Sequence, residues 1–157
     1  MIVIDLADET ATATLAARIA ELAGPSDIIA LRGELGSGKT SFARAFIRVR
    51  GNQEEEIPSP TFTLVQVYES RSSQSPVIWH FDLYRLRAAE EAWELGIEEA
   101  FGEGISLIEW PERLGSLLPP RRLQIILEFG NSPGARRAWL DPGTGWQARL
   151  PSIAADA

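Results

Sequence analysis

The stretch Gly33-Glu34-Leu35-Gly36-Ser37-Gly38-Lys39-Thr40 decides the fold of this chain. It fits the phosphate-binding pattern G-x-x-x-x-G-K-[ST] at every fixed position. Its glycines allow the backbone to curl around an anion, and a helix that follows adds the positive end of its dipole. Lys39 is the only lysine in the chain, whereas the other fourteen basic residues are arginines. The stretch therefore predicts a phosphate-binding loop, with Lys39 reaching between the β- and γ-phosphates of a nucleotide.

Segments on both sides of the loop support this prediction. Residues 28–31 form a short apolar run that predicts a buried strand. After the loop, apolar residues recur at helical spacing, at Phe42, Ala45, Phe46 and Val49. Gly51 then supplies a stop signal for that helix. Strand, glycine loop and helix thus follow in the order of a nucleotide-binding loop, which disfavours the alternative of a glycine-rich surface turn.

The bulk properties indicate one compact domain. The chain has 157 residues, 45% of them apolar, and we expect the domain to span residues 1–150 with 151–157 as a flexible tail. It has no cysteine, which excludes disulfides and thiolate metal sites and is compatible with the cytosol. The start of the chain lacks the regions of a signal peptide, and no apolar run has the length of a membrane span. We therefore expect a cytoplasmic protein without a membrane partner.

The charge of the chain bears on its partners. A formal net charge of −7 disfavours a broad basic surface of the kind that covers nucleic acid. We therefore expect no DNA partner. Any contact with RNA would be local or indirect.

Helical and strand-like segments alternate along the chain. A helix capped by Asp8 or Thr10 is expected to end at Leu22. Further helical segments are expected at residues 88–94, 98–101 and 114–118. Strand patterns occupy residues 2–4, 61–69, 76–84, 105–108, 123–129 and 137–140. Because 61–69 and 76–84 predict a hairpin and the last two strands an antiparallel pair, we expect an α/β fold whose mixed sheet is mainly parallel at its centre.

Two acidic residues stand where a nucleotide loop needs partners for a metal ion. Asp82 ends one strand pattern, and Glu109 follows the continuously apolar run 105–108. In proteins with this loop, a carboxylate at the end of a neighbouring strand holds Mg²⁺, often through water. Either residue also fits a solvated strand end, and Glu109 is favoured because its run predicts a strand buried beside the loop strand. Thr40 adds a hydroxyl, which is a hard oxygen ligand suited to Mg²⁺.

Two other polar residues have an open role. Pro60 would stiffen a loop that presents Thr61 near the γ-phosphate, as in a switch segment, and an edge strand begun by proline is the equal alternative. His80 is the only histidine and lies within a strand pattern. A lone histidine in a strand is more often a hydrogen-bonded structural residue than a catalyst, so a structural role is favoured for His80.

Five segments of the chain follow one another in an order that resembles a known family. They are residues 33–42, Ser59-Pro60-Thr61-Phe62-Thr63-Leu64-Val65, His80-Phe81-Asp82-Leu83-Tyr84-Arg85-Leu86, Glu94-Leu95-Gly96-Ile97 and Leu107-Ile108-Glu109-Trp110-Pro111-Glu112. Together they resemble the TsaE family, also called the YjeE family, over roughly residues 8–140. Many NTPases share the loop, whereas the strings His-Phe-Asp-Leu-Tyr-Arg and Ile-Glu-Trp-Pro are much more specific.

The resemblance carries expectations about fold and activity. TsaE is the small bacterial ATPase of tRNA threonylcarbamoyladenosine synthesis. The resemblance therefore implies a P-loop NTPase fold with a mixed sheet, ATP or ADP and Mg²⁺ as cofactors, and slow ATP hydrolysis. It also implies the partners TsaB and TsaD, of which TsaD transfers the threonylcarbamoyl group to the adenosine at tRNA position 37. TsaE would use ATP to drive that complex through repeated turnovers and would meet tRNA only indirectly.

The resemblance also assigns roles to residues. Lys39 would bind phosphate, Thr40 would bind Mg²⁺, and Thr61 would lie in a switch-like loop. Asp82 and Glu109 would hold the metal or position water. The nucleotide would contact Gly33, Glu34, Leu35, Gly36, Ser37, Gly38, Lys39, Thr40, Ser41 and Arg136.

Two flanking features complete the implied site. Trp110 would support the acidic residues, and the start of the first helix, at residues 9–12, would approach the adenine. Glu34 stands where the family usually has an aspartate, at a position whose side chain the phosphate chemistry does not need.

Two other functions fit the loop. A small-molecule kinase shares it, and the arginine pairs at 121–122 and 136–137 would then be lid residues, although they flank a predicted strand. A nucleotide-gated adaptor would bind ATP and a partner without needing hydrolysis. Both remain open at this point because the loop alone does not distinguish them.

Overall fold

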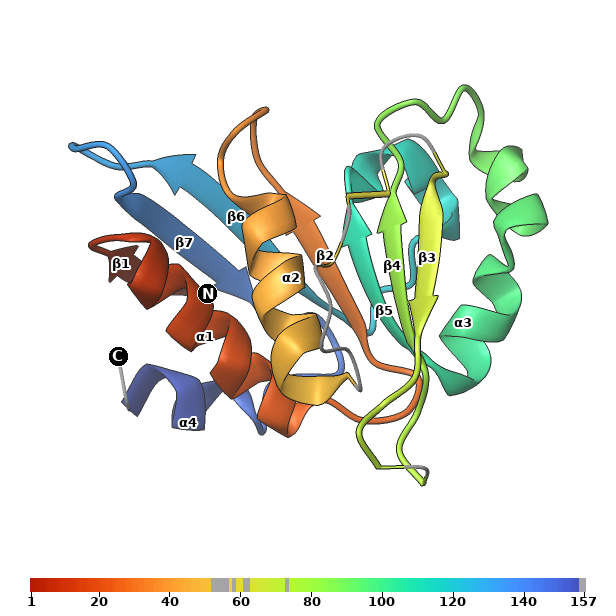
Figure 1. Cartoon of the computed structure of the whole chain (residues 1–157), viewed down its shortest axis with the longest axis horizontal. Helices are drawn as coiled ribbons and strands as arrows, with labels where there is room; N and C mark the ends of the chain where they lie inside the picture. Colours follow the sequence, from red (N-terminus) through yellow and green to blue (C-terminus); the bar gives the residue numbers. More distant parts are fainter. Residues whose placement is uncertain (52–56, 58, 61–62, 73, 156–157) are drawn as a thin grey trace.

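A single mixed sheet organises the molecule. The computed structural model describes residues 1–157 except 52–56, 58, 61–62, 73 and 156–157. Within the described residues, seven strands pair in the order β1-β7-β6-β2-β5-β4-β3 (Figure 1). Strands β6, β2, β5 and β4 are parallel, and the outer pairs β1–β7, β7–β6 and β4–β3 are antiparallel. The strands are β1 (Ile2–Leu6), β2 (Ile28–Arg32), β3 (Val65–Tyr68), β4 (Ile78–Asp82), β5 (Ile105–Glu109), β6 (Arg122–Phe129) and β7 (Arg136–Asp141).

Helices cover both faces of this sheet. Helices α1 (Glu9–Leu22), α2 (Lys39–Arg50) and α4 (Leu150–Ala155) pack on one face, with α1 beside α2 (Figure 1). The 3₁₀ segments η1 (Ala89–Leu95) and η2 (Pro111–Leu117) pack with α3 (Ile97–Glu103) on the other. Strands β2 and β5 are therefore buried on both faces, as their continuous apolar runs predict. Among the helices that the structure describes, none is long and apolar enough to span a membrane.

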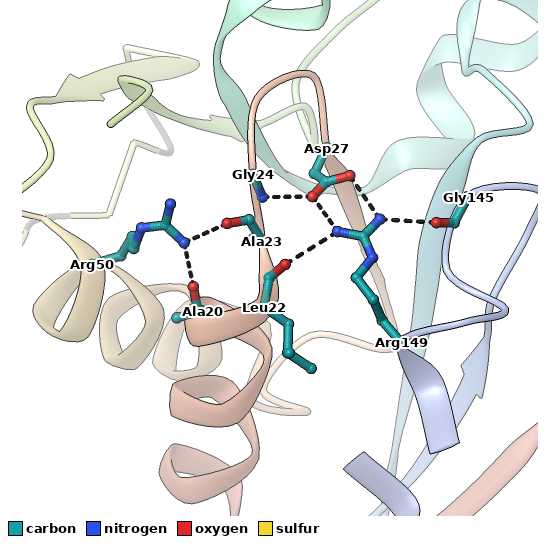
Figure 2. A network of polar contacts seen from close by, with 8 residues as sticks. All are labelled: Ala20, Leu22, Ala23, Gly24, Asp27, Arg50, Gly145 and Arg149. Carbon is teal, nitrogen blue, oxygen red and sulfur yellow. Dashed lines mark hydrogen bonds and ion pairs between the residues drawn. The ribbon is translucent and has the colours of Figure 1, made fainter. Parts of the chain in front are cut away.

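The two ends of α1 are held by side chains. At its start, the Asp8 carboxylate accepts a hydrogen bond of 2.8 Å from the backbone N–H of Ala11 and so caps the helix. At its end, Arg50 donates to the carbonyls of Ala20 and Ala23 (Figure 2). The last carbonyls of a helix lack partners within it, so this contact supplies what α1 itself cannot.

A second arginine ties the same helix end to the C-terminal part of the chain. Arg149 donates to both carboxylate oxygens of Asp27, at 2.5 and 3.0 Å, and to the carbonyls of Leu22 and Gly145 (Figure 2). Asp27 also accepts from the backbone N–H of Gly24 at 2.6 Å. This network fixes the turn between α1 and β2, and β2 is the strand that leads into the loop.

The predicted fold class is confirmed, and some details differ. The sequence predicts a helix at 88–94, whereas this segment is the 3₁₀ segment η1, which ends at Leu95 and is followed by Gly96 with a left-handed backbone. In α2, Phe42 and Phe46 are buried as predicted, but Val49 is exposed and Ile47 lies in the core in its place. The apolar stripe of a helix is wide enough for either phase, and contacts with α1 and β2 select between them.

The end of the chain also differs from the expected loose tail. Residues 150–155 form α4, and the side chains of Leu150 and Ile153 are buried in the core beneath α1. The helix is too short to be stable alone, so this docking stabilises it.

Candidate functional site

Three parallel strands bring the candidate residues to one edge of the sheet. β2 ends at Arg32 and runs into the loop, while Asp82 ends β4 and Glu109 ends β5. Asp82 lies opposite Glu109 in the β4–β5 register, and Leu31 lies opposite Glu109 in the β2–β5 register. A cavity of about 230 Å³ opens at this edge. Its lining consists of Leu35, Gly36, Gly38, Lys39, Thr40, Ser41, Asp82, Tyr84, Glu109 and Trp110.

The loop needs glycine for steric reasons. Gly33 has a φ of +149°, and a Cβ atom there would lie 2.4 Å from the Ser37 hydroxyl and 2.6 Å from the carbonyl oxygen of Leu127. Gly38, which precedes the first turn of α2, has a φ of +106°. Side chains at these two positions would force the loop to open, so the motif fixes the loop's shape.

Lys39 lines the cavity, and its side chain is held by neighbouring groups. Only 5% of the residue is exposed, and its ammonium donates to the carbonyls of Gly33 and Glu34, the latter at 2.9 Å. The same group lies 4.2 Å from the centre of the Trp110 ring. Burial lowers the pKa of Lys39, and the carboxylates of Glu109, Glu112 and Asp82 oppose that shift. The ammonium is thus desolvated and within reach of an anion that enters the cavity.

Glu109 makes hydrogen bonds with two other side chains at this cavity. Its Oε1 accepts from the Thr40 hydroxyl at 2.7 Å, and its Oε2 lies 2.7 Å from Nε2 of His80. The Glu109 side chain is 3% exposed. Asp82 lines the same cavity, and its Oδ1 accepts from the backbone N–H of Tyr84 at 3.1 Å. Glu109 therefore contacts Thr40 directly, across the cavity edge.

Arg136, the first residue of strand β7, contacts the loop. Its Nε donates to the carbonyl of Ser37 at 2.8 Å, and one terminal nitrogen donates to the carbonyl of Gly36 at 3.1 Å. A second cavity of about 90 Å³ lies beside this contact, between the loop and the start of α1. Its lining consists of Glu9, Thr12, Ala13, Gly36, Gly38, Ser41, Gly134 and Arg136. The helix start that the family resemblance assigns to the adenine therefore lies next to the loop.

The structure describes Trp110, which was predicted to support the site, but not Thr61. Thr61 lies outside the residues that the structure describes, so its role stays a prediction. Trp110 lines the cavity with a left-handed backbone, at φ 60° and ψ 50°, and its ring contacts that of Tyr84 at 5.0 Å. Tyr84 was not singled out from the sequence, although it lies two residues after Asp82 in the specific string. That spacing is the signal that points to it.

The oxygen donors of the cavity suit Mg²⁺. The Thr40 hydroxyl and the carboxylates of Asp82 and Glu109 line one cavity, and Mg²⁺ prefers hard oxygen ligands. In the part of the chain that the structure describes, no group of three or more His, Cys, Asp or Glu side chains forms a metal site. Mg²⁺ usually keeps water and phosphate oxygens in its shell and takes only one or two carboxylates from a protein.

Comparisons with known proteins agree on one family. The sequence model for "Threonylcarbamoyl adenosine biosynthesis protein TsaE" matches residues 6–138. The TsaE protein of Rickettsia conorii is 42% identical over 123 residues, which cover 78% of this chain and 69% of that protein. The TsaE protein of Bacillus subtilis is 36% identical over 118 residues, with 74% and 71% coverage. Both relatives are described as tRNA threonylcarbamoyladenosine biosynthesis proteins.

A solved structure extends the agreement to the fold. The crystal structure of Bacillus subtilis YdiB superposes with a TM-score of 0.77 at 25% identity, covering 99% of this chain and 95% of YdiB. The superposition covers the sheet, the loop and the C-terminal strands alike, because almost the whole of each chain takes part. On sequence and fold together, the chain belongs to the TsaE family of tRNA threonylcarbamoyladenosine biosynthesis proteins.

Proposed function

We propose that this chain is the Mg²⁺-dependent subunit that binds and hydrolyses ATP for tRNA N6-threonylcarbamoyladenosine synthesis at position 37. It acts in the cytoplasm with TsaB and TsaD, sustains their turnover, and meets tRNA through that complex. One observation carries the proposal: Lys39 of the loop shares a single cavity with Thr40, Asp82 and Glu109. These are the cation, the hydroxyl and the carboxylates that phosphoryl transfer to water requires.

Each residue of the cavity has a task in this proposal. Lys39 binds the β- and γ-phosphates, leaving the loop carbonyls to which it now donates. Thr40, Asp82 and Glu109 would hold Mg²⁺, which when bound neutralises charge on the phosphates. Glu109 also orients the attacking water. Catalysis then rests on positioning and charge, which are the main contributions in this class of reaction.

Arg136 explains why hydrolysis by the isolated chain is expected to be slow. An arginine that stabilises charge in the transition state accelerates such reactions by about 10³-fold or more. Arg136 contacts the loop, but its Nε and one terminal nitrogen are bonded to loop carbonyls. The proposal therefore expects the partners to complete the site.

One observation favours the alternative of a nucleotide-gated adaptor. Both oxygens of Glu109 are engaged, one by Thr40 and one by His80, so neither is available as a base without rearrangement. The kinase alternative has less support. Arg121 donates to the carbonyl of Phe101 and Arg122 to that of Pro119, which are structural contacts rather than those of a lid.

The test is ATP turnover with and without the partners. Lys39→Ala and Glu109→Gln are each expected to lower the rate by about 100-fold or more, because each removes charge that is positioned for the transition state. Arg137→Gln, on the exposed side of β7, is the matched control and should turn over normally. Normal turnover in Lys39→Ala contradicts the proposed role of the loop.

A second measurement separates the ATPase from its alternatives. Phosphate should appear in water, whereas a kinase would transfer it to an acceptor. Repeated threonylcarbamoyl transfer supported by a non-hydrolysable ATP analogue would favour the adaptor.

A further inference from the structure

The single histidine of the chain lies beneath the candidate metal site. His80 is in the middle of β4 and is fully buried. It shares one face of the strand with Asp82, because side chains two residues apart point the same way. In the β4–β5 register His80 lies opposite Leu107, two residues before Glu109. Its Nε2 therefore meets the Glu109 carboxylate from inside the protein, at 2.7 Å from Oε2.

The other ring nitrogen shows which way the hydrogen bond runs. Nδ1 of His80 is buried and has no hydrogen-bond partner among the described residues. A buried N–H without a partner costs more than a bare ring nitrogen with one unused lone pair. The tautomer that leaves Nδ1 bare carries its proton on Nε2, which donates to Glu109. The carboxylate remains an acceptor on both oxygens.

We propose that His80 is a positioning residue for Glu109. By holding Oε2 from inside, it fixes the plane of the carboxylate and leaves Oε1 as the single oxygen that faces Thr40 and the loop. The terminal torsion of a glutamate is broad and has no strong preference of its own, so an outside contact must set it. This inference rests on the proposed role of Glu109 with nucleotide and Mg²⁺, and it adds that Glu109 acts through one oxygen.

The local packing supports this division of the two oxygens. The Thr40 hydroxyl at 2.7 Å from Oε1 lies at the start of α2, on the loop side of Glu109. His80 at 2.7 Å from Oε2 lies on the neighbouring strand, with no exposed surface. Only Oε1 is therefore directed toward the loop. Partners of this kind behind a metal ligand typically change metal affinity by about 10- to 100-fold when removed.

The first test needs neither nucleotide nor metal. Because His80 is the only histidine, an ¹⁵N spectrum of the imidazole in the untagged protein reports on this residue alone. We expect a protonated Nε2 and an unprotonated Nδ1 in the wild type, and a clear change of the Nε2 signal in Glu109→Gln. A proton on Nδ1 in place of Nε2 would overturn the proposal.

The second test measures how much Mg²⁺ strengthens ADP binding, by calorimetry with Mg²⁺ and with a chelator. His80→Leu should reduce that gain by about tenfold and leave the metal-free affinity for ADP unchanged. His80→Gln, whose amide N–H can replace Nε2–H, should recover most of the gain. In the Glu109→Gln background, His80→Leu should have no further effect, because His80 acts through Glu109.

Controls separate this inference from instability and from failure of the proposed function. Ile78→Ala disturbs the same face of β4 two residues earlier and should lower the melting temperature without changing the metal-dependent gain. An equal loss of that gain in Ile78→Ala would assign the His80 effect to stability. If Glu109→Gln loses the gain and His80→Leu retains it, the His80 proposal alone is wrong. If the wild type shows no Mg²⁺-dependent binding, the proposed function fails with it.

Discussion

At the scale of single residues, burial decides the chemistry of the cavity. Lys39 and Glu109 are both nearly buried, and each has neutral or oppositely charged partners at hydrogen-bond distance. An uncompensated charge at such a depth is costly, and both charges have such partners within the protein itself. Under the proposed function, a phosphate would replace the loop carbonyls as the partner of the desolvated ammonium.

The buried side chain of Tyr68 is expected to make the stability of the protein depend on pH in the alkaline range. It is 8% exposed, and its hydroxyl has no hydrogen-bond partner among the described residues. Burial raises the pKa of Tyr68 above 10.0, against a smaller opposing effect of Arg44. As pH rises through 10.0 the unfolded chain therefore loses this proton before the folded chain, and stability falls.

Tyr68→Phe is expected to reduce that alkaline loss. At neutral pH it should change the free energy of unfolding by less than about 1 kcal/mol, because the hydroxyl makes no bond that is lost. Urea unfolding at neutral pH and near pH 10.0 measures both quantities. An identical alkaline slope in the wild type and the variant would show that Tyr68 ionises normally in the fold.

Some site residues could be predicted from the sequence, and others depend on strand register. Lys39 and Thr40 follow from the spacing of the loop, and Glu109 from the apolar run before it. The structure gathers all three in one cavity. His80 was assigned a structural role, and its contact with Glu109 depends on the pairing of two strands far apart in sequence. A sequence pattern does not fix such a pairing.

At the scale of elements, α1 depends on side chains from elsewhere in the chain. Its own last turn contains no basic residue. Arg50 from α2 and Arg149 from the segment before α4 contact its last carbonyls (Figure 2). Three helices that pack on the same face of the sheet are thereby joined at one point.

Arg149→Met is expected to destabilise the protein by about 1–3 kcal/mol, because it removes a two-point contact and leaves the partly buried Asp27 carboxylate with fewer donors. Chemical denaturation measures this loss. Arg137→Met is the matched control, since its pair with Asp5 is exposed to solvent, and it should cost little. Equal losses in the two variants would contradict the role assigned to the Arg149 network.

Some boundaries of helices can be predicted from nearby residues alone. Residue type offers Asp8 or Thr10 as the cap of α1 and Gly51 as the stop of α2, and the structure has Asp8 and Gly51 in these roles. The 3₁₀ form of η1 and the docking of α4 are set by contacts with the rest of the fold. Six residues that include Pro151 carry too little helical preference to reveal α4 in isolation.

At the scale of the whole molecule, the parallel and antiparallel strands of the sheet have different roles. The candidate residues lie at the ends of the parallel centre, while the antiparallel strands extend the sheet on either side. The alternation of strand and helix patterns predicted the parallel part, and the hairpin patterns predicted the antiparallel part. The order of strands in the sheet was not predicted, because it depends on long-range pairing.

The docking of the C-terminal helix α4 is expected to contribute to the stability of the whole domain. Ile153 is 1% exposed and packs in the core cluster that includes α1. Ile153→Ala should cost about 2–4 kcal/mol of unfolding free energy. Val49→Ala is the control, because that side chain is 37% exposed on α2 and its loss should stay within about 0.5 kcal/mol. A loss in Ile153→Ala no larger than in the control would mean that α4 is not docked in solution.

The solitary lysine has a practical consequence for chemical biology. Besides the terminal amino group, Lys39 is the only primary amine of the chain, and burial lowers its pKa. An ATP derivative bearing an acyl phosphate should acylate Lys39 in stoichiometric amount. A general amine reagent should modify mainly the terminus, because the lysine is enclosed. Peptide mass spectrometry of the two products would then measure how much of the cavity is occupied.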